Sequence, residues 1–135
     1  YVTGLFQIGI RNVSSTARDG YADARSMGSD ILSVRQFRAL GVDQVLARIP
    51  SGRVYITIDI DGFDPSIAPG TGTPSHGGFL YYEALELLDG LARRGNIIGI
   101  DLVEVAPDYD HTGSTTTLAA QILLNVIGRM LYHRK

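Results

Sequence analysis

Residues 54–65 of the chain read VYITIDIDGFDP, and this stretch decides the fold. Its first part is β-branched and almost continuously apolar, which is typical of a strand in the middle of a parallel sheet. Two carboxylates, Asp59 and Asp61, close the strand. A long loop rich in glycine and proline follows from Gly62 to Gly78, and loops of such length in compact domains are usually functional.

Strand and helix patterns alternate along the rest of the chain. Further strands are predicted at 5–10, 30–34 and 97–103, and helices over 34–49 (interrupted near Gly41), 79–94 and 115–131. The helix 79–94 is amphipathic, with its apolar side formed by Leu80, Ala84, Leu87, Leu88 and Leu91. A polar segment, 13–27, is read as a long loop with or without a short helix. The alternation indicates an α/β fold with a parallel sheet covered by helices on both faces. With 44% hydrophobic and 19% charged residues, the chain of 135 residues can form a packed core.

Composition excludes several classes of protein. The net charge is −2 and no basic stripe stands out, so a nucleic-acid partner is not expected. The absence of cysteine excludes disulfides and thiolate metal sites. No apolar run reaches the roughly 20 residues that span a bilayer, and the first residues do not resemble a signal peptide. We therefore expect a cytoplasmic protein without a membrane partner.

Polar side chains follow three of the predicted strands. Arg11-Asn12, the Asp59/Asp61 pair and Glu104 each stand where a strand ends. In open parallel sheets, ligands bind outside the carboxyl ends of the strands. The sequence therefore predicts a functional site at that edge of the sheet.

The Asp59/Asp61 pair predicts a cation site. On a strand, residues two apart point to the same face, so the two carboxylates would repel each other unless a cation lay between them. Carboxylates suit Mg²⁺, Ca²⁺ and Mn²⁺. The alternative is that both are exposed strand-end acids or caps of the following loop.

Other polar residues admit a functional and a structural interpretation. Glu104 could bind a guanidinium by paired hydrogen bonds or form a local salt bridge. His76 and His111 could be metal ligands or proton carriers, or solvated loop histidines. Asp64, which precedes Pro65, is predicted to cap backbone amides of its turn. The chain has neither Gly-x-Ser-x-Gly nor a Gly-Lys-Ser phosphate loop, which argues against an unrelated α/β hydrolase or phosphatase.

Several blocks of this sequence together resemble the ureohydrolase (arginase/agmatinase) family. IDIDGFDP (58–65), PGTGTP (69–74) and Gly77-Gly78 are similar to a metal-binding block of that family, GIDLVEVAP (99–107) to a downstream block of its agmatinase branch, and QIGIR (7–11) to the strand before its specificity loop. The resemblance implies a three-layer α/β/α arginase-like fold with a parallel sheet. Residues 1–135 would then be the C-terminal part of a single ureohydrolase domain.

The same resemblance implies a chemistry. Two manganese ions per complete site would activate water for attack on a guanidinium carbon, which releases urea. Asp59 would bridge both ions and Asp61 would bind one, while Glu104 would hold the guanidinium with Thr73 beside it. Self-association into trimers or hexamers is expected by resemblance.

The expected substrate is a small guanidino compound. In the family that this chain resembles, arginases end the early strand with Arg-Asp-x-Asp. Here the run is Arg11-Asn12-Val13-Ser14, and the absence of both acids disfavours arginine as the substrate. Agmatine is the first choice, with guanidinobutyrate, guanidinopropionate and guanidine as alternatives. Asn12, Ser14 and His76 are predicted to lie on the substrate side of the pocket.

The family's upstream ligand blocks, Gly-Gly-Asp-His and Asp-Ala-His-x-Asp, do not occur in these residues. Because two carboxylates do not build a tight binuclear centre alone, we expect this chain to be inactive without an N-terminal half. An alternative of another class is a noncatalytic binding or assembly module.

Overall fold

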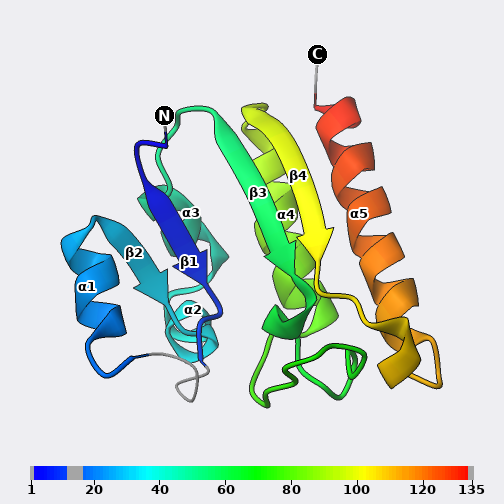
Figure 1. The fold of residues 1–135 in the computed structure, drawn as a ribbon. Coiled ribbons are helices and arrows are strands. Elements are labelled where there is room, and N and C mark those ends of the chain that lie inside the picture. Colours follow the sequence, from blue (N-terminus) through cyan, green and yellow to red (C-terminus); the bar gives the residue numbers. More distant parts are fainter. Residues whose placement is uncertain (1, 12–16, 134–135) are drawn as a thin grey trace.

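The computed structural model describes residues 2–11 and 17–133, and in these residues four strands alternate with helices (Figure 1). The strands are β1 (Leu5–Ile8), β2 (Ser29–Leu32), β3 (Val54–Asp59) and β4 (Ile97–Val103). The helices are α1 (Gly20–Ser26), α2 (Val34–Leu40), α3 (Val42–Arg48), α4 (Tyr81–Arg93) and α5 (Ser114–Tyr132), with short 3₁₀ turns η1 (Ile60–Gly62) and η2 (Pro107–Tyr109). The predicted break near Gly41 is confirmed, since this glycine separates α2 from α3 with φ 79°.

The strands pair in parallel, as predicted. β1 pairs with β2 and β3 pairs with β4, so the described residues contain two separate two-stranded sheets where one sheet was expected. All four strands run the same way in Figure 1, and their carboxyl ends lie near the loop that follows η1. The α/β class is therefore confirmed, and the topology brings the predicted strand ends to one edge of the molecule.

β3 differs from the prediction in two ways. It ends at Asp59 and not at Asp61, which belongs to η1. Its burial also alternates, because Ile56 is in the core whereas Tyr55 and Thr57 are exposed. Helices were expected to cover both faces of the sheet. Within the described residues, only one face of β3 is covered and the other is exposed.

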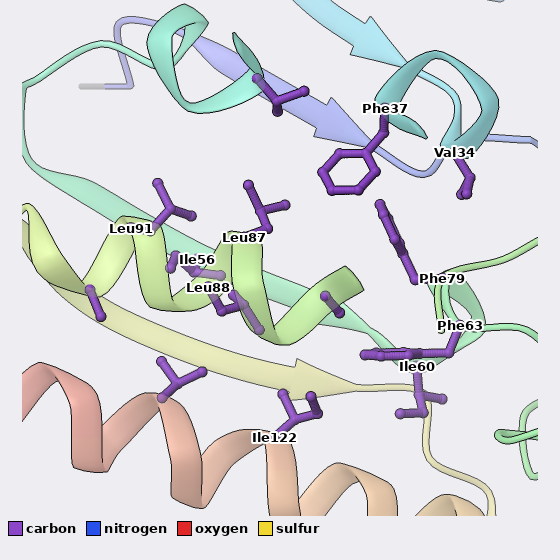
Figure 2. Packing of buried hydrophobic residues seen from close by; sticks show 14 of the residues in the cluster. Val34, Phe37, Ile56, Ile60, Phe63, Phe79, Leu87, Leu88, Leu91 and Ile122 are labelled. Carbon is purple, nitrogen blue, oxygen red and sulfur yellow. The ribbon is translucent and has the colours of Figure 1, made fainter. Parts of the chain in front are cut away.

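The hydrophobic core lies between the β3–β4 pair and its helices (Figure 2). α4 contributes the predicted Leu87, Leu88 and Leu91, and α5 contributes Ile122, which is fully buried. Burial of a side chain of this size stabilises the fold by about 1.5–3 kcal/mol. Leu80, predicted for this face, is 47% exposed because it precedes the first turn of α4 as its N-cap.

Two further contacts extend the core. The rings of Phe37 and Phe79 meet edge to face with centroids 4.9 Å apart, which joins α2 to the segment before α4. Asp89, buried on α4, forms ion pairs with Arg93 and with Arg129 of α5. The two arginines compensate the buried charge of Asp89. None of the helices in the described part is long and apolar enough to cross a bilayer.

Candidate active site

The carboxyl ends of β3 and β4 bring the first two candidate residues together. In the parallel register Asp59 lies opposite Val103, the last residue of β4. Glu104 directly follows Val103 and therefore lies beside the end of β3. The two carboxylates are close enough for the charge of Glu104 to act on Asp59. Sequence reasoning placed both residues at one sheet edge, and the structure does the same.

A tight turn, and not a continuous strand, relates Asp59 to Asp61. The amide N of Asp61 donates to Oδ1 of Asp59 at 3.1 Å, and the chain closes the 3₁₀ turn η1 between them. The prediction that both side chains lie on the same face of one strand is therefore wrong, because Asp61 belongs to η1 and the hydrogen bond from its amide to the Asp59 side chain competes with strand geometry. The carboxylates remain adjacent, at the start of the loop rather than along the sheet.

The charge environment at this turn is unfavourable for anions. Partial loss of hydration raises the pKa of Asp59 above its ordinary value, and the charges of Asp61 and Glu104 raise it further against the opposing hydrogen bond from the Asp61 amide. Neighbouring carboxylates and burial both disfavour the ionised form. The carboxylate of Asp59 thus lies within reach of two other negative charges, and a bound cation would relieve this repulsion.

Thr73 reaches this cluster from the far arm of the loop. Its hydroxyl Oγ1 donates to Oδ2 of Asp61 at 2.8 Å, although twelve residues separate the two in sequence. The loop 62–78 therefore folds back over η1. Thr73 lies beside a candidate ligand, where it can hold the carboxylate of Asp61 in one orientation.

Glu104 has an unusual backbone. It is the one non-glycine residue with a positive φ, 64°, among residues 2–11 and 17–133. A side chain in this left-handed region costs about 1–2 kcal/mol. Strain of this kind clusters at functional sites, and here it directs the chain away from β4 directly after the strand ends.

The two ends of the loop 62–78 are closed on each other. Asp64 accepts from the amides of Ser66 at 3.0 Å and Gly77 at 2.8 Å, and these hydrogen bonds, led by those from Ser66, lower its pKa from 3.8 to about 2. The predicted capping role of Asp64 is confirmed. Gly78 packs so tightly here that a Cβ would overlap the main chain of Phe63.

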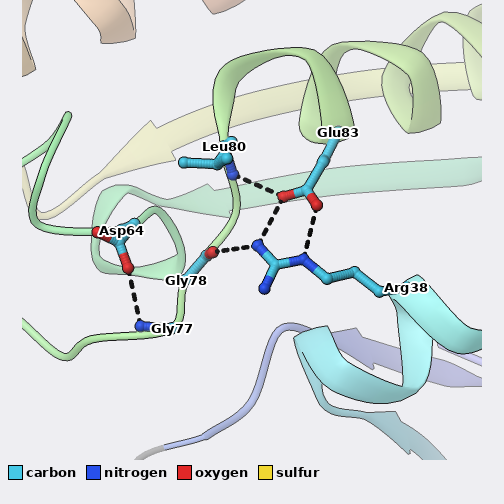
Figure 3. Close-up of polar contacts among 6 residues, drawn as sticks. All are labelled: Arg38, Asp64, Gly77, Gly78, Leu80 and Glu83. Atoms are coloured by element: carbon cyan, nitrogen blue, oxygen red, sulfur yellow. Dashed lines mark hydrogen bonds and ion pairs between the residues drawn. The ribbon is translucent and has the colours of Figure 1, made fainter.

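Figure 3 shows how the same loop is fixed to α4 and α2. Arg38 of α2 forms a two-pronged pair with Glu83, at 2.7 and 3.0 Å, and donates to the Gly78 carbonyl at 3.1 Å. Glu83 also accepts from the Leu80 amide at 2.8 Å. Helices on two sides therefore hold the end of the loop in place.

A buried polar cluster supports the middle of the loop. Thr115, fully buried on α5, accepts from the Gly70 amide at 2.8 Å, and Asp110 accepts from the Thr115 amide at 2.7 Å. Hydrogen bonds from Thr112 and Thr115 lower the pKa of Asp110 well below its usual range. Sequence reasoning did not find this support, because neither acid nor hydroxyl stands in a recognisable spacing to the loop.

The remaining predicted site residues are not all brought to the cluster. His76 has an exposed side chain on the loop's second arm, and His111 is exposed in the turn before α5. Asn12 and Ser14 lie outside the described residues. Asp101 is engaged away from the cluster, since it accepts from Tyr55 at 2.8 Å and Thr57 at 2.6 Å on the exposed face of β3–β4.

The donor types present fit a hard cation, but their number does not complete a site. Asp59 and Asp61 supply carboxylate oxygens, which suit Mn²⁺. Within the described residues no group of three or more histidine, cysteine or acidic residues is placed to hold a metal ion. A tight binuclear centre would need further ligands from outside these residues.

Comparison with known proteins identifies the family. Residues 2–128 match the model of the arginase family. The chain belongs to the arginase family. It is 38% identical over 127 residues to a guanidinobutyrase of Pseudomonas aeruginosa and 41% identical over 127 residues to a mitochondrial agmatinase of Gallus gallus. These matches cover 91% of this chain but only 39% and 37% of the two relatives.

Solved structures of similar proteins share the fold. Formimidoylglutamase from Bacillus subtilis superimposes with a TM-score of 0.84 at 30% identity, over 93% of this chain and 41% of that one. Proclavaminate amidinohydrolase from Streptomyces clavuligerus superimposes with a TM-score of 0.75 at 36% identity, over 96% and 41% of the two chains. The arginase-like fold predicted from the sequence is confirmed.

Proposed function

We propose that this chain forms part of a manganese-dependent ureohydrolase, which hydrolyses a small guanidino compound to an amine and urea. The observation that carries the proposal is the meeting of Asp59, Asp61 and Glu104 at one sheet edge, with Thr73 hydrogen-bonded to Asp61. Family membership supports it, since relatives named guanidinobutyrase, guanidinopropionase and agmatinase are 38–41% identical.

Each residue has a proposed part in the reaction. Asp59 and Asp61 would hold manganese, which when bound supplies the activation of water. The carboxylate of Glu104 would accept two N–H bonds from the planar guanidinium, and Thr73 would orient Asp61. Because the described residues supply two such ligands, we propose that a segment preceding this chain in a longer protein supplies the others.

Agmatine is the proposed first substrate, with guanidinobutyrate and guanidinopropionate as the closest alternatives. The two relatives from Pseudomonas aeruginosa are named for the two acids and the relative from Gallus gallus for agmatine. We propose that the protein distinguishes an amine tail from an acid tail by means of Asn12, Ser14 and His76. Cytoplasmic location and a trimeric or hexameric assembly also stay predictions.

A second candidate function is that of a noncatalytic binding or assembly module. The incomplete ligand set within the described residues favours it. It predicts a stable fold that binds no manganese, whereas the hydrolase predicts manganese binding once the upstream segment is present.

The test measures urea release and bound manganese for the protein with its upstream segment, with agmatine, guanidinobutyrate, guanidinopropionate and arginine in turn. Loss of a group that only orients a metal ligand typically costs about 10- to 100-fold. Asp59→Asn removes a proposed ligand itself and should therefore lower urea release by more than this. Asp101→Asn is the matched control, because Asp101 is bonded to Tyr55 and Thr57 on the exposed face. Absence of urea from every substrate at saturating manganese would refute the assignment.

A further inference from the structure

Arg11 follows β1 and binds both arms of the loop 62–78 through their main chain. Its Nη2 donates to the carbonyls of Asp61 and of Phe63 (3.2 Å) on the first arm, and of Ser75 (2.6 Å) on the second. Its Nε donates to the carbonyls of Ser75 at 3.2 Å and His76 at 3.3 Å. One half-buried side chain thus joins two segments that are twelve or more residues apart.

The same guanidinium is anchored to its own strand. Nη1 donates to the carbonyl of Gly9 at 3.3 Å, directly after β1. Gly9 itself is held against the loop's end, since a Cβ there would lie 2.8 Å from the Phe79 ring. The position of Arg11 is therefore fixed by β1 and the core, and the loop is fixed to Arg11.

The geometry of the candidate ligand depends on these bonds. The contact from Thr73 to the Asp61 carboxylate, 2.8 Å, joins the same two arms that Arg11 joins from the main-chain side. Arg11 holds the main chain of Asp61 and Thr73 holds its side chain, and together these two bonds determine where the carboxylate lies. Groups that orient metal-binding residues in this way typically contribute about 10- to 100-fold to metal affinity or activity.

We propose that Arg11 is a positioning residue, which holds the Asp61 carboxylate in the orientation that a cation requires by joining the two arms of the loop. The inference rests on the proposed function and deepens it. Lysine should not replace Arg11, because its ammonium is a single point with three donors, whereas the guanidinium offers five N–H groups in a planar fork.

Arg94 provides a matched control within the chain. It is also half-buried, and it donates only to main-chain carbonyls in the described residues, those of Ile49 (2.8 Å) and Leu46. These carbonyls belong to the end of α3, which contributes no residue to the carboxylate cluster. Arg94→Lys therefore measures the loss of such capping bonds without a change at Asp61.

The experiment compares Arg11→Lys with Arg94→Lys in the protein that includes the upstream segment. We expect Arg11→Lys to weaken manganese binding and to lower kcat, each by about 10- to 100-fold. KM should change less, because Arg11 is bonded to the main chain of the loop, including the His76 carbonyl, and to no side chain proposed to bind the substrate. Amide hydrogen exchange in the loop 62–78 should be faster in the metal-free Arg11→Lys protein. Arg94→Lys should change none of these quantities.

Each outcome decides the matter. Equal manganese affinity and equal loop exchange in Arg11→Lys and the unchanged protein would overturn the role of Arg11, as would equal losses in both variants. An Arg11→Lys protein that fails to fold while Arg94→Lys folds would make Arg11 a general stabiliser and overturn it too. If the unchanged protein neither binds manganese nor releases urea, the proposed function itself fails.

Discussion

The substitution Thr115→Val tests whether the buried polar cluster supports the loop 62–78. Thr115 is fully buried, and its hydroxyl accepts from the Gly70 amide at 2.8 Å and is bonded to Asp110. Valine has nearly the same shape, so the change removes these two hydrogen bonds and leaves the packing intact. The Gly70 amide is buried as well and would have no acceptor in this place.

The expected loss of stability follows from these contacts. A buried donor without a partner costs about 1–3 kcal/mol, and the bond to Asp110 adds about 1 kcal/mol. The new buried methyl group returns about 0.8 kcal/mol. The free energy of unfolding should therefore fall by about 1–3 kcal/mol.

Denaturant unfolding of the metal-free protein, followed by circular dichroism, measures this loss. The control is Thr116→Val, the same change at the next, exposed residue of α5, which should stay within about 0.5 kcal/mol of the original. The slope of the transition should not change, since the exposed area on unfolding is the same. Equal midpoints for the two variants would show that the Gly70–Thr115 bond does not support the loop.

Three further predictions concern the loop and its ends. Asp64 has a pKa lowered to about 2, so its contribution is present above pH 3.8 and lost as the pH falls towards 2; Asp64→Asn should flatten the stability profile in that window, measured by denaturant midpoints against pH. Gly78→Ala should destabilise the protein because its Cβ would overlap the main chain of Phe63, and an unchanged melting temperature would contradict the packing. Glu104→Gly should raise the free energy of unfolding by about 1 kcal/mol through relief of the positive φ while it abolishes urea release, whereas Glu104→Gln should abolish release without that gain.

Much of the fold follows from local patterns. The β-branched, largely apolar run 54–61 predicted β3, which ends two residues earlier, at Asp59. The helical spacing of Leu87, Leu88 and Leu91 predicted the buried face of α4. The strand ends also located the site, because parallel strands bring their carboxyl ends to one edge. These features depend on residues that are neighbours in sequence or in one period.

The features that the sequence did not predict depend on contacts between distant residues or on local competition. The bond from the Asp61 amide to Asp59 ends β3 two residues early, and no periodicity reports it. The bonds of Arg11 to Phe63 and Ser75 span 52 and 64 residues. The one indication in the sequence was that Arg11, like Asp59 and Glu104, stands directly after a predicted strand.

The distribution of hydrogen bonds explains how this loop can hold carboxylates close together. Main-chain groups of the loop are bonded to Arg11, Thr115 and Arg38, which belong to other parts of the fold. One more is bonded to Asp64 within the loop itself. The Asp59 and Asp61 carboxylates are bonded only within the cluster among the described contacts, by the Asp61 amide and Thr73. The loop is therefore rigid where it meets the core, and its carboxylate oxygens keep capacity for further partners. The Asp59 and Asp61 carboxylates repel each other in the metal-free protein. Binding of a cation would relieve this repulsion and stabilise the fold in the same step.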